Sequence, residues 1–297
     1  KVEDEVIKKA EVLLESYPYI KEYKDKIFVV KIGGSVLHIE EERNDILQDI
    51  AFLEVVGINV IVVCGGGPFI TEEIEKRGGK VTFIDGLRVT DKNTLQIVQD
   101  VLFNVRDGIV DELVQKFQVN ASSLLPEEKY VIAKKIHYQR GAEVVDLGFV
   151  GQVDQVNNEY IKNKLEKYKV LVAAPLFYDK DGVLLNVNAD SVASSIAESL
   201  KAEKLIFLTD VLGIMRHPEK SETLISILEL SEGNELIEKK VIKEGMIPKA
   251  ISSISAIKNG VKKVHIISGN ISHSILLEVF TKAGVGTEII KDGEEPD

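Results

Sequence analysis

Short apolar runs alternate with amphipathic stretches along most of this chain. Runs rich in Val and Ile predict buried strands, and apolar residues spaced three or four apart predict helices. The expected strands are 27–31, 59–63, 169–174, 183–187, 204–209, 263–267 and 286–290. The expected helices are 2–17, 44–56, 68–77, 91–117, 158–167, 190–201, 248–259 and 271–283, with hairpins within 129–156. Repeated strand–helix units predict an α/β fold, a three-layer αβα sandwich around a mostly parallel sheet.

The first expected helix precedes the first core strand and forms an N-terminal extension. Its apolar residues fall near helical spacing, at Val2, Val6, Ala10, Leu13, Leu14 and Tyr17. Pro18 is expected to interrupt the helix. A helix in this position is expected to pack on the body of the protein or on another subunit.

Two apolar runs each end in a tight cluster of glycines. IFVVKIGG at 27–34 carries Lys31 just before its glycines, and IVVCGGGP occupies 61–68. Glycine lets the backbone adopt positive φ or approach a ligand closely, and lysine supplies a point charge for a phosphoryl group. Either cluster alone is equally consistent with an ordinary strand-to-helix turn. Together they suggest phosphate chemistry.

In a sheet of this kind, ligands bind beyond the carboxyl ends of the strands. These ends present two lysines, two aspartates and many backbone N–H groups, a set suited to positioning and neutralising a phosphoryl group. The strand-end residues are Lys31, Gly33, Gly34, Ser35, Cys64–Gly67, Asn186, Asn188, Asp190, Thr209 and Asp210, with Lys249 in the first turn of a helix. The G-x-x-x-x-G-K-[ST] and G-x-G-x-x-G motifs are missing, which disfavours a P-loop NTPase or a Rossmann dehydrogenase.

Composition removes several other classes of function. The formal net charge of −11 disfavours a nucleic-acid partner. The single cysteine, Cys64, excludes an intramolecular disulfide and a Cys-rich zinc site, and the five histidines lack metal-ligand spacing, so no protein-bound metal is expected. No apolar run approaches the roughly 20 residues that span a bilayer, and no signal peptide is visible. We therefore expect a cytoplasmic protein that does not bind membranes.

Five segments, taken in order, resemble the amino acid kinase family. They are VKIGGSVL (30–37), VVCGGGPFI (62–70), GLRVT (86–90), LNVNADSVASSIAESLKAEKLIFLTDVLGI (185–214) and GMIPKA (245–250). The resemblance covers nearly the whole chain and is closest to the branch that acts on N-acetyl-L-glutamate. It implies phosphorylation of the side-chain carboxylate of that small-molecule substrate by ATP in arginine biosynthesis, with Mg²⁺ carried by ATP.

The resemblance also implies roles for individual residues. Lys31 and Lys249 would stabilise the transferring γ-phosphoryl group, and Asp190 would hold both lysines in place. The acyl amino acid would be bound by Gly66, Gly67, Arg88 and Asn186. The nucleotide would be contacted by Gly33, Gly34, Asp210, Gly213 and Met246.

The same resemblance implies a division of the chain and an assembly. Residues 25–180 would bind the acyl amino acid and residues 181–297 the nucleotide, on one continuous sheet. Residues 1–24 resemble the helix that links dimers into a hexameric ring in arginine-inhibited members of the branch. Residues 265–286 resemble the region that binds arginine in those enzymes. A hexamer with arginine as inhibitor is therefore expected, and a helix that packs on its own subunit is the alternative.

Three positions depart from the family's usual pattern. Cys64 replaces a usual His, Ile32 a usual aromatic residue, and Glu244 a usual Gly. Cys64 and Ile32 are expected to reshape the floor of the substrate pocket, and Glu244 to weaken ATP binding. A kinase for a related substrate such as acetyl-aminoadipate, free or linked to a carrier protein, stays open. A non-catalytic sensor of arginine or nucleotide is the other alternative, although the retained lysines and Asp190 argue against it.

Overall fold

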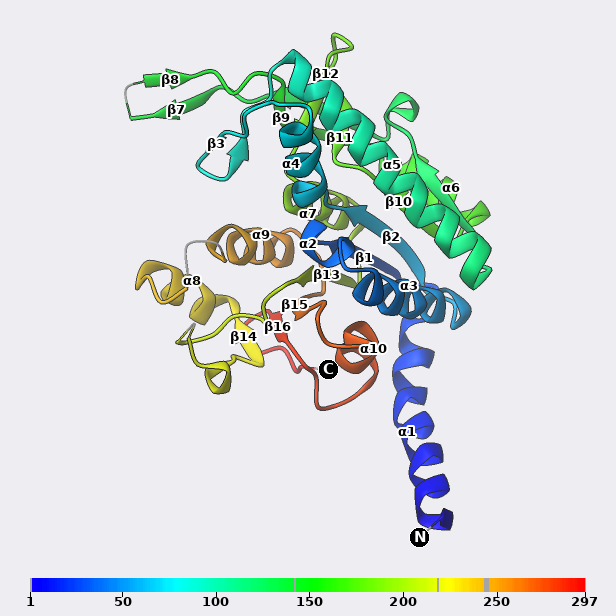
Figure 1. Ribbon diagram of the computed structural model, residues 1–297. Helices are drawn as coiled ribbons and strands as arrows, with labels where there is room; N and C mark the ends of the chain where they lie inside the picture. The colour runs from blue at the N-terminus through cyan, green and yellow to red at the C-terminus, as the bar shows by residue number, and fades with distance from the viewer. Residues whose placement is uncertain (1, 142, 218, 243–245, 297) are drawn as a thin grey trace.

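The computed structural model describes residues 2–141, 143–217, 219–242 and 246–296 (Figure 1). Its centre is an eight-stranded sheet in the order β14-β16-β15-β13-β1-β2-β10-β5. The strands are β1 (Ile27–Ile32), β2 (Asn59–Cys64), β5 (Ala121–Leu124), β10 (Val170–Ala173), β13 (Lys204–Thr209), β14 (Ile227–Glu229), β15 (Lys263–Ser268) and β16 (Thr287–Ile290). All neighbours run parallel except β15 and β16. The predicted mostly parallel sheet is therefore confirmed.

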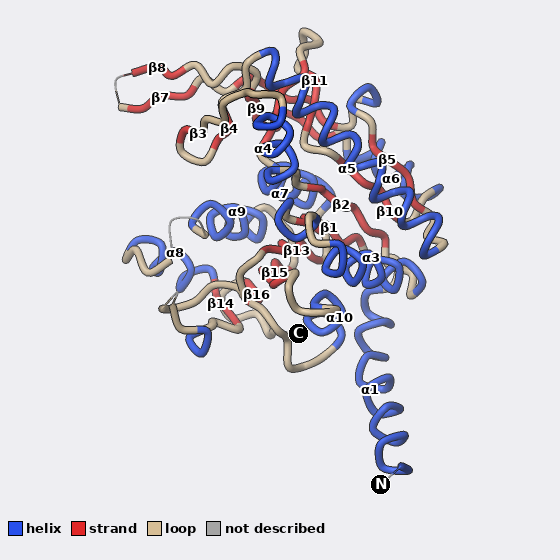
Figure 2. Tube along the Cα trace, viewed as in Figure 1, coloured by secondary structure: helices blue, strands red, loops and turns tan. Residues whose placement is uncertain are grey.

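Helices cover both faces of this sheet, as Figure 2 shows, because alternate residues of each central strand face opposite sides. In β1, Val29 belongs to one apolar core and Val30 to the other, and both are fully buried. The first core is closed by α6 (Asn158–Lys167), α7 (Ala189–Leu200), α8 (Leu230–Glu238) and α9 (Ile247–Lys258). The second is closed by α2 (Gly34–Leu37), α3 (Glu40–Val55), α4 (Gly67–Lys76), α5 (Lys92–Phe117) and α10 (Ser274–Phe280). The three-layer αβα sandwich is confirmed.

A second, smaller sheet covers one end of the molecule. Its strands lie in the order β11-β12-β9-β6. They are β6 (Val131–Lys135), β9 (Val150–Val156), β11 (Leu176–Tyr178) and β12 (Leu184–Val187). Two separate hairpins project beside it (Figure 1): β3 (Phe83–Ile84) with β4 (Leu87–Arg88), and β7 (Tyr138–Arg140) with β8 (Glu143–Val145). The hairpins expected within 129–156 are thus present.

The N-terminal helix does not end where the sequence suggested. Helix α1 (Val2–Tyr23) continues through Pro18. A proline inside a helix removes one backbone hydrogen bond, but the turn that follows is held by packing. Tyr23 is buried with its ring 5.4 Å from that of Phe28, and Ile20 packs on the same core. Tertiary burial therefore outweighs the local penalty.

Other differences have local causes as well. The helix expected at 271–283 covers only Ser274–Phe280, because His273 adopts a left-handed φ of 55° and its Nδ1 lies 2.7 Å from Oδ1 of Asp49 on α3. The sequence reading also missed β5, β11, β14 and α8. Between strand 204–209 and helix 248–259 it assigned no element, yet β14 and α8 lie there.

Candidate active site

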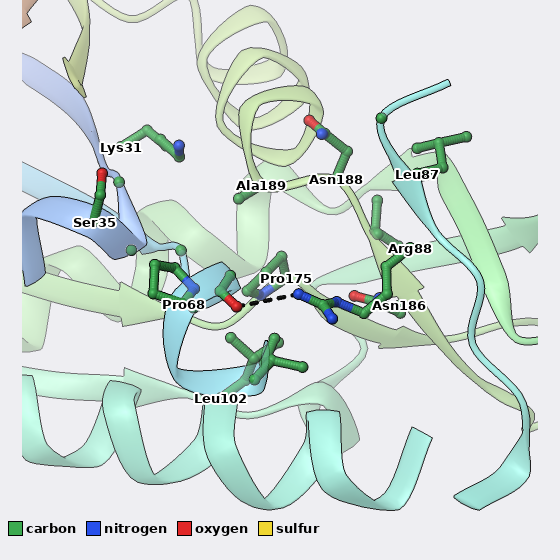
Figure 3. Close-up of a pocket in the computed structure, with 18 of the residues that line it drawn as sticks. Lys31, Ser35, Pro68, Leu87, Arg88, Leu102, Pro175, Asn186, Asn188 and Ala189 are labelled. Atoms are coloured by element: carbon green, nitrogen blue, oxygen red, sulfur yellow. Dashed lines mark hydrogen bonds between the residues drawn. The ribbon is translucent and has the colours of Figure 1, made fainter. Parts of the chain in front are cut away.

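A cavity of ≈ 360 Å³ opens at the carboxyl ends of the central strands. It brings together ten of the predicted site residues, which come from distant parts of the chain. These are Lys31, Gly33, Gly34, Gly66, Gly67, Arg88, Asn186, Asp210 and Lys249, which line it, and Asp190, which contacts two of them. Figure 3 shows Lys31 and Ser35 toward one end of the cavity, and Arg88 and Asn186 toward the other.

One end of the cavity holds a buried carboxylate between two ammonium groups. Lys31 lies on β1, next to the last residue of the strand, and its Nζ is 2.9 Å from Oδ1 of Asp190. Lys249, in the first turn of α9, donates to Oδ2 of the same carboxylate. The side chain of Lys31 is only 11% exposed, that of Asp190 12% and that of Lys249 16%. The set carries one net positive charge in a water-poor setting, where its attraction for an anion is strong.

The protonation of these groups follows from their burial and mutual contacts. Burial disfavours the ionised carboxyl group of Asp190, but Lys31 and Lys249 together outweigh it and hold its pKa below the usual value. Burial lowers the pKa of Lys31, and Lys249 lowers it further, while Asp190 opposes the shift. Asp190 is therefore held as an anion by its contacts with both lysines.

The two glycine clusters pack directly against each other next to this charged set. A Cβ on Gly34 would lie 2.8 Å from Cδ of Pro68 and 2.9 Å from the backbone N of Gly67. A Cβ on Gly65 would lie 2.9 Å from the backbone N of Gly34. None of these glycines has positive φ. Close backbone approach, and not an unusual φ, is what requires glycine here.

Helix N-termini converge on the same end of the cavity. Helix α4 begins at Gly67 and α7 at Ala189, and both residues line the cavity. Helix α9 begins two residues before Lys249. The free N–H groups and dipoles of helix N-termini favour anions. Backbone and lysines therefore act together to make this end a site for a highly charged anion.

The other end of the cavity is built around a buried guanidinium group. Arg88 is 7% exposed, and its Nη2 donates to the backbone oxygen of Gly67 at 3.1 Å and to Oγ1 of Thr71 at 3.0 Å. Its Nη1 is buried, and within the described parts of the chain it finds no hydrogen-bond partner. A buried guanidinium with a free donor is a site for a ligand carboxylate.

Thr90 joins the two predicted carboxylate-binding residues. Its hydroxyl donates to the backbone oxygen of Arg88 at 2.7 Å and accepts from Nδ2 of Asn186 at 3.3 Å. Thr90 is fully buried. Sequence reasoning quoted this threonine within the GLRVT segment but gave it no role.

Apolar and small residues complete the wall between the two ends. They are Pro68, Ile70, Phe83, Leu87, Leu102, Val150 and Pro175. Pro68, Ile70 and Leu87 lie in quoted segments. Nothing in the local sequence marked the other four as cavity residues, because each reaches the cavity through the tertiary fold. Ser35 and Asn188, noted at the strand ends, also line it.

Some predicted positions lie elsewhere. Gly213, with φ of 155°, packs on Thr287, and Met246 caps α9 and packs on the first core, so neither lines this cavity. Ile32 and Cys64 are fully buried in the second core and do not form the cavity floor, contrary to expectation. Burial raises the pKa of the Cys64 thiol to about 12. Glu244 lies outside the described residues.

Among the described residues, the ionisable side chains form no ready-made metal centre. Over the described ranges, no three side chains of His, Cys, Asp or Glu lie together so as to hold a metal ion. Asp190 is already occupied by two lysines, and Asp210 is the other carboxylate at this end. In the part of the chain that the structure describes, no helix is long and apolar enough to cross a membrane.

Fold and site together define a protein that binds and orients anions at the ends of a parallel sheet, and sequence comparison gives the class. Residues 26–268 match the amino acid kinase family. The chain belongs to this family. It is 45% identical over 294 residues to the acetylglutamate kinase of Methanocaldococcus jannaschii, covering 97% of this chain and 98% of that protein. It is 46% identical over 297 residues to the acetylglutamate kinase of Aquifex aeolicus, covering 96% and 99%.

Solved structures agree with this assignment of the fold. The N-acetylglutamate synthase of Neisseria gonorrhoeae, complexed with coenzyme A and N-acetyl-glutamate, superposes with a TM-score of 0.85 at 27% identity. The match covers 96% of this chain, which spans 64% of that synthase chain. Carbamate kinase from Giardia lamblia, bound to AMP-PNP, superposes with a TM-score of 0.63 over 90% of this chain and 99% of its own. Its 18% identity supports the shared fold alone.

The contact between the glycine turns predicts different effects at two neighbouring positions. Gly34→Ala places a methyl group within 3 Å of backbone and proline atoms, so we expect it to lower the free energy of unfolding by about 1–3 kcal/mol. Gly67→Ala is the matched control, because no atom of a neighbouring segment lies within 4 Å of the place its methyl group would take. Thermal unfolding of both variants is the measurement. Equal melting temperatures would contradict the proposed close packing.

Proposed function

We propose that this protein transfers the γ-phosphoryl group of ATP to the side-chain carboxylate of N-acetyl-L-glutamate, in arginine biosynthesis. The observation that carries the proposal is the Lys31–Asp190–Lys249 set beside two packed glycine turns, in one cavity with Arg88. The relatives that share 45% and 46% of their residues with this chain are acetylglutamate kinases. Both ends of the cavity suit a substrate with two carboxylates.

The reaction needs orientation and charge neutralisation more than proton transfer. A glutamate side-chain carboxylate has an ordinary pKa near 4.3 and is already ionised at neutral pH. One of its oxygens forms the new bond to the γ-phosphorus, while the bond from that phosphorus to the bridging β–γ oxygen breaks and ADP leaves. No general base is required. The barrier lies in bringing two anions together and in stabilising the transferring group.

The residues of the cavity divide this work between them. We assign the α-carboxylate to Arg88, whose Nη1 is buried without a described partner, and to the Asn186 amide. This assignment fixes the substrate at the end away from the lysines. The N–H groups of Gly66 and Gly67 face the acyl amino acid. Lys31 and Lys249 meet the phosphoryl group between the two reactants. Asp190 acts as a positioning residue, because its carboxylate fixes both ammonium groups.

The nucleotide is assigned to the other side of the lysines. Asp210 lines the cavity there, and we extend the site toward Gly213 and Met246 beyond it. Gly34 presents its backbone N–H group to the phosphates. The N–H group of Gly33 donates to the backbone oxygen of Leu208 at 3.0 Å, so Gly33 is assigned to this site only for the close approach that its missing side chain allows. Mg²⁺ arrives with ATP and is held mainly by phosphate oxygens, since it prefers substrate phosphates to all-protein cages. We retain the division at residues 25–180 and 181–297, although β11 and β12 pair across that boundary.

A second cavity supports regulation by arginine. It encloses ≈ 180 Å³ between β15, α10 and the loop that follows, and is lined by His265, Glu278, Lys282, Gly284 and Glu288 among others. Glu278 is buried, yet contacts with His265 and with the N–H groups of Val285 and Gly286 keep its pKa below the usual value. Glu278 and Glu288 both present carboxylates to this cavity, and each also contacts a basic side chain, His265 and Lys263 respectively. We assign these two carboxylates to a guanidinium ligand. The N. gonorrhoeae synthase has also been solved with L-arginine.

The N-terminal helix supports assembly into a hexamer. Its exposed large apolar side chains are Ile7, Val12, Leu13, Leu14 and Tyr17, and Ile7, Leu14 and Tyr17 recur at helical spacing. Leu13 and Leu14 are 71% and 72% exposed. Figure 1 shows α1 projecting from the body, so its own subunit leaves this face open. An exposed apolar stripe on a helix favours contact with a second copy.

Loss of either lysine tests the catalytic assignment. We expect Lys31→Ala and Lys249→Ala each to lower kcat by about 10²–10³-fold, because each removes a cation from the transferring phosphoryl group. Folding should change little, since Asp190 keeps the other lysine as its partner. The matched control is Lys134→Ala, which breaks an exposed ion pair with Asp154 outside the cavity. ADP release with N-acetyl-L-glutamate is the measurement, and near-normal turnover in either cavity variant would overturn its role.

The arginine cavity predicts a change in inhibition without a change in catalysis. Glu278→Gln removes one negative charge, so we expect at least about tenfold more arginine for half-inhibition, as for loss of a charge-assisted bond. The uninhibited rate should stay near that of the parent protein. Glu198→Gln, a partly buried carboxylate outside the cavity, is the control. Unaltered inhibition in Glu278→Gln, or none in the parent, would refute the assignment.

The exposed stripe on α1 predicts the oligomeric state. We expect Leu13→Glu/Leu14→Glu to convert the hexamer to dimers, because charges replace apolar surface at the contact. Deletion of residues 1–14 should do the same while leaving Tyr19, Ile20 and Tyr23 on the core. Light scattering measures both. If the parent protein is itself a dimer, the proposed hexamer is wrong.

A further inference from the structure

One wall of the substrate cavity is a hairpin with little support of its own. Strands β3 and β4 have two residues each, and Phe83, Gly86, Leu87 and Arg88 line the cavity. The turn at Asp85–Gly86 has positive φ at both positions, 45° and 80°, as type I′ turns require. Such a short two-stranded hairpin is marginal in water. Its position therefore depends on contacts with other segments.

The base of the hairpin is fixed by backbone contacts. The N–H group of Thr90 donates to the oxygen of Leu147 at 2.9 Å, and that of Phe149 donates to the oxygen of Thr90 at 2.7 Å. Gly148 passes so close that a Cβ there would lie 2.1 Å from the oxygen of Thr90. The segment that follows β8 is therefore hydrogen-bonded to the segment that follows β4.

The tip of the hairpin is held by a different contact. The hydroxyl of Tyr138, on β7, donates to Oδ2 of Asp85 in the turn. The β7–β8 hairpin runs beside β3 on the same side of the molecule (Figure 1). One continuous segment, from β7 to the start of β9, thus contacts the β3–β4 hairpin at both its tip and its base.

Inside the hairpin, the tip is coupled to the substrate end of the cavity. Phe83 and Arg88 are cross-strand partners, and the Arg88 guanidinium carbon lies 4.6 Å from the centre of the Phe83 ring. A displacement of the turn therefore moves the ring that covers the guanidinium group. Tyr138 contacts Asp85, which lies two residues along the chain from Phe83 and three from Arg88.

We propose that Tyr138 is a positioning residue for the substrate, acting through Asp85 to hold the β3–β4 hairpin in its binding position. The proposal rests on the proposed function, in which Arg88 binds the α-carboxylate. When only part of the protein is in the binding position, the apparent affinity falls in proportion to that fraction. Loss of the tyrosine contact therefore weakens binding of the acyl amino acid and leaves the phosphoryl-transfer end intact.

Tyr138→Phe removes the hydroxyl and keeps the ring. We expect the KM for N-acetyl-L-glutamate to rise about three- to tenfold, the effect of one hydrogen bond to a charged group at a partly exposed site. The kcat and the KM for ATP should stay within about twofold of the parent, since neither involves the hairpin. In a double-mutant cycle with Asp85→Asn, the two substitutions together should raise the KM for N-acetyl-L-glutamate by less than the product of their separate effects.

The matched control is Tyr178→Phe. Tyr178 also contacts a carboxylate, Glu127, at 3.4 Å, but it lies outside the cavity. We expect this control to leave both KM values unchanged. Equal increases in both KM values for Tyr138→Phe, or an unchanged KM for the acyl amino acid, would overturn the proposal.

A second readout separates this inference from the identity of the substrate. Amide hydrogen exchange of the peptide covering 83–90, measured without any ligand, should be faster in Tyr138→Phe than in the parent and unchanged in Tyr178→Phe. If the parent protein does not turn over N-acetyl-L-glutamate, the proposed function fails while this exchange result still decides the role of Tyr138. Unchanged hydrogen exchange of this peptide in Tyr138→Phe would show that Tyr138 does not hold the β3–β4 hairpin in position.

Discussion

The carboxylate of Asp190, buried between two lysines, is the interaction on which the active site depends. A buried charge is tolerated only when it is paired, and here one anion is paired with two cations that come from β1 and α9. The arrangement fixes the distance between the lysines, and it leaves a net positive charge for the phosphoryl group. Because the three groups come from one strand and two helices that pack on the sheet, the fold and the charge pattern constrain each other.

The glycine turns show how the same sheet makes room for the reactants. Both clusters lie at the carboxyl ends of adjacent parallel strands, so their backbones meet where the strands stop. A side chain at Gly34 or Gly65 would hold the two turns apart. Contact between the turns places α4 next to the lysine end of the cavity. The two clusters thus form one structural unit at the edge of the cavity.

Sequence reasoning succeeded where information is local and failed where it is not. Val- and Ile-rich strands buried on both faces, such as β1 and β13, have a strong pattern, and so do amphipathic helices such as α7. Edge strand β5 reads ASSL and shows no apolar alternation. Helix α8 has only nine residues and contains Gly233, which lowers its helix propensity. Helix α1 continues through Pro18 because Tyr23 packs in the core. Helix α10 begins at Ser274 because His273, just before it, contacts Asp49 of α3. Such contacts join residues that local patterns cannot pair.

The site itself shows the same limit in a different form. Lys31, Asp190 and Lys249 carry charge at strand and helix ends, so their residue types indicate chemistry before the fold is known. The apolar wall formed by Phe83, Leu102 and Pro175 has no such signature, because each residue is ordinary in its own segment. Cys64 and Ile32 looked like determinants of the substrate, but they face the core behind the cavity. Under the proposed function, the substrate extends from Arg88 to the lysines. We therefore expect discrimination between acidic acyl amino acids of different length to reside in the wall and the hairpin.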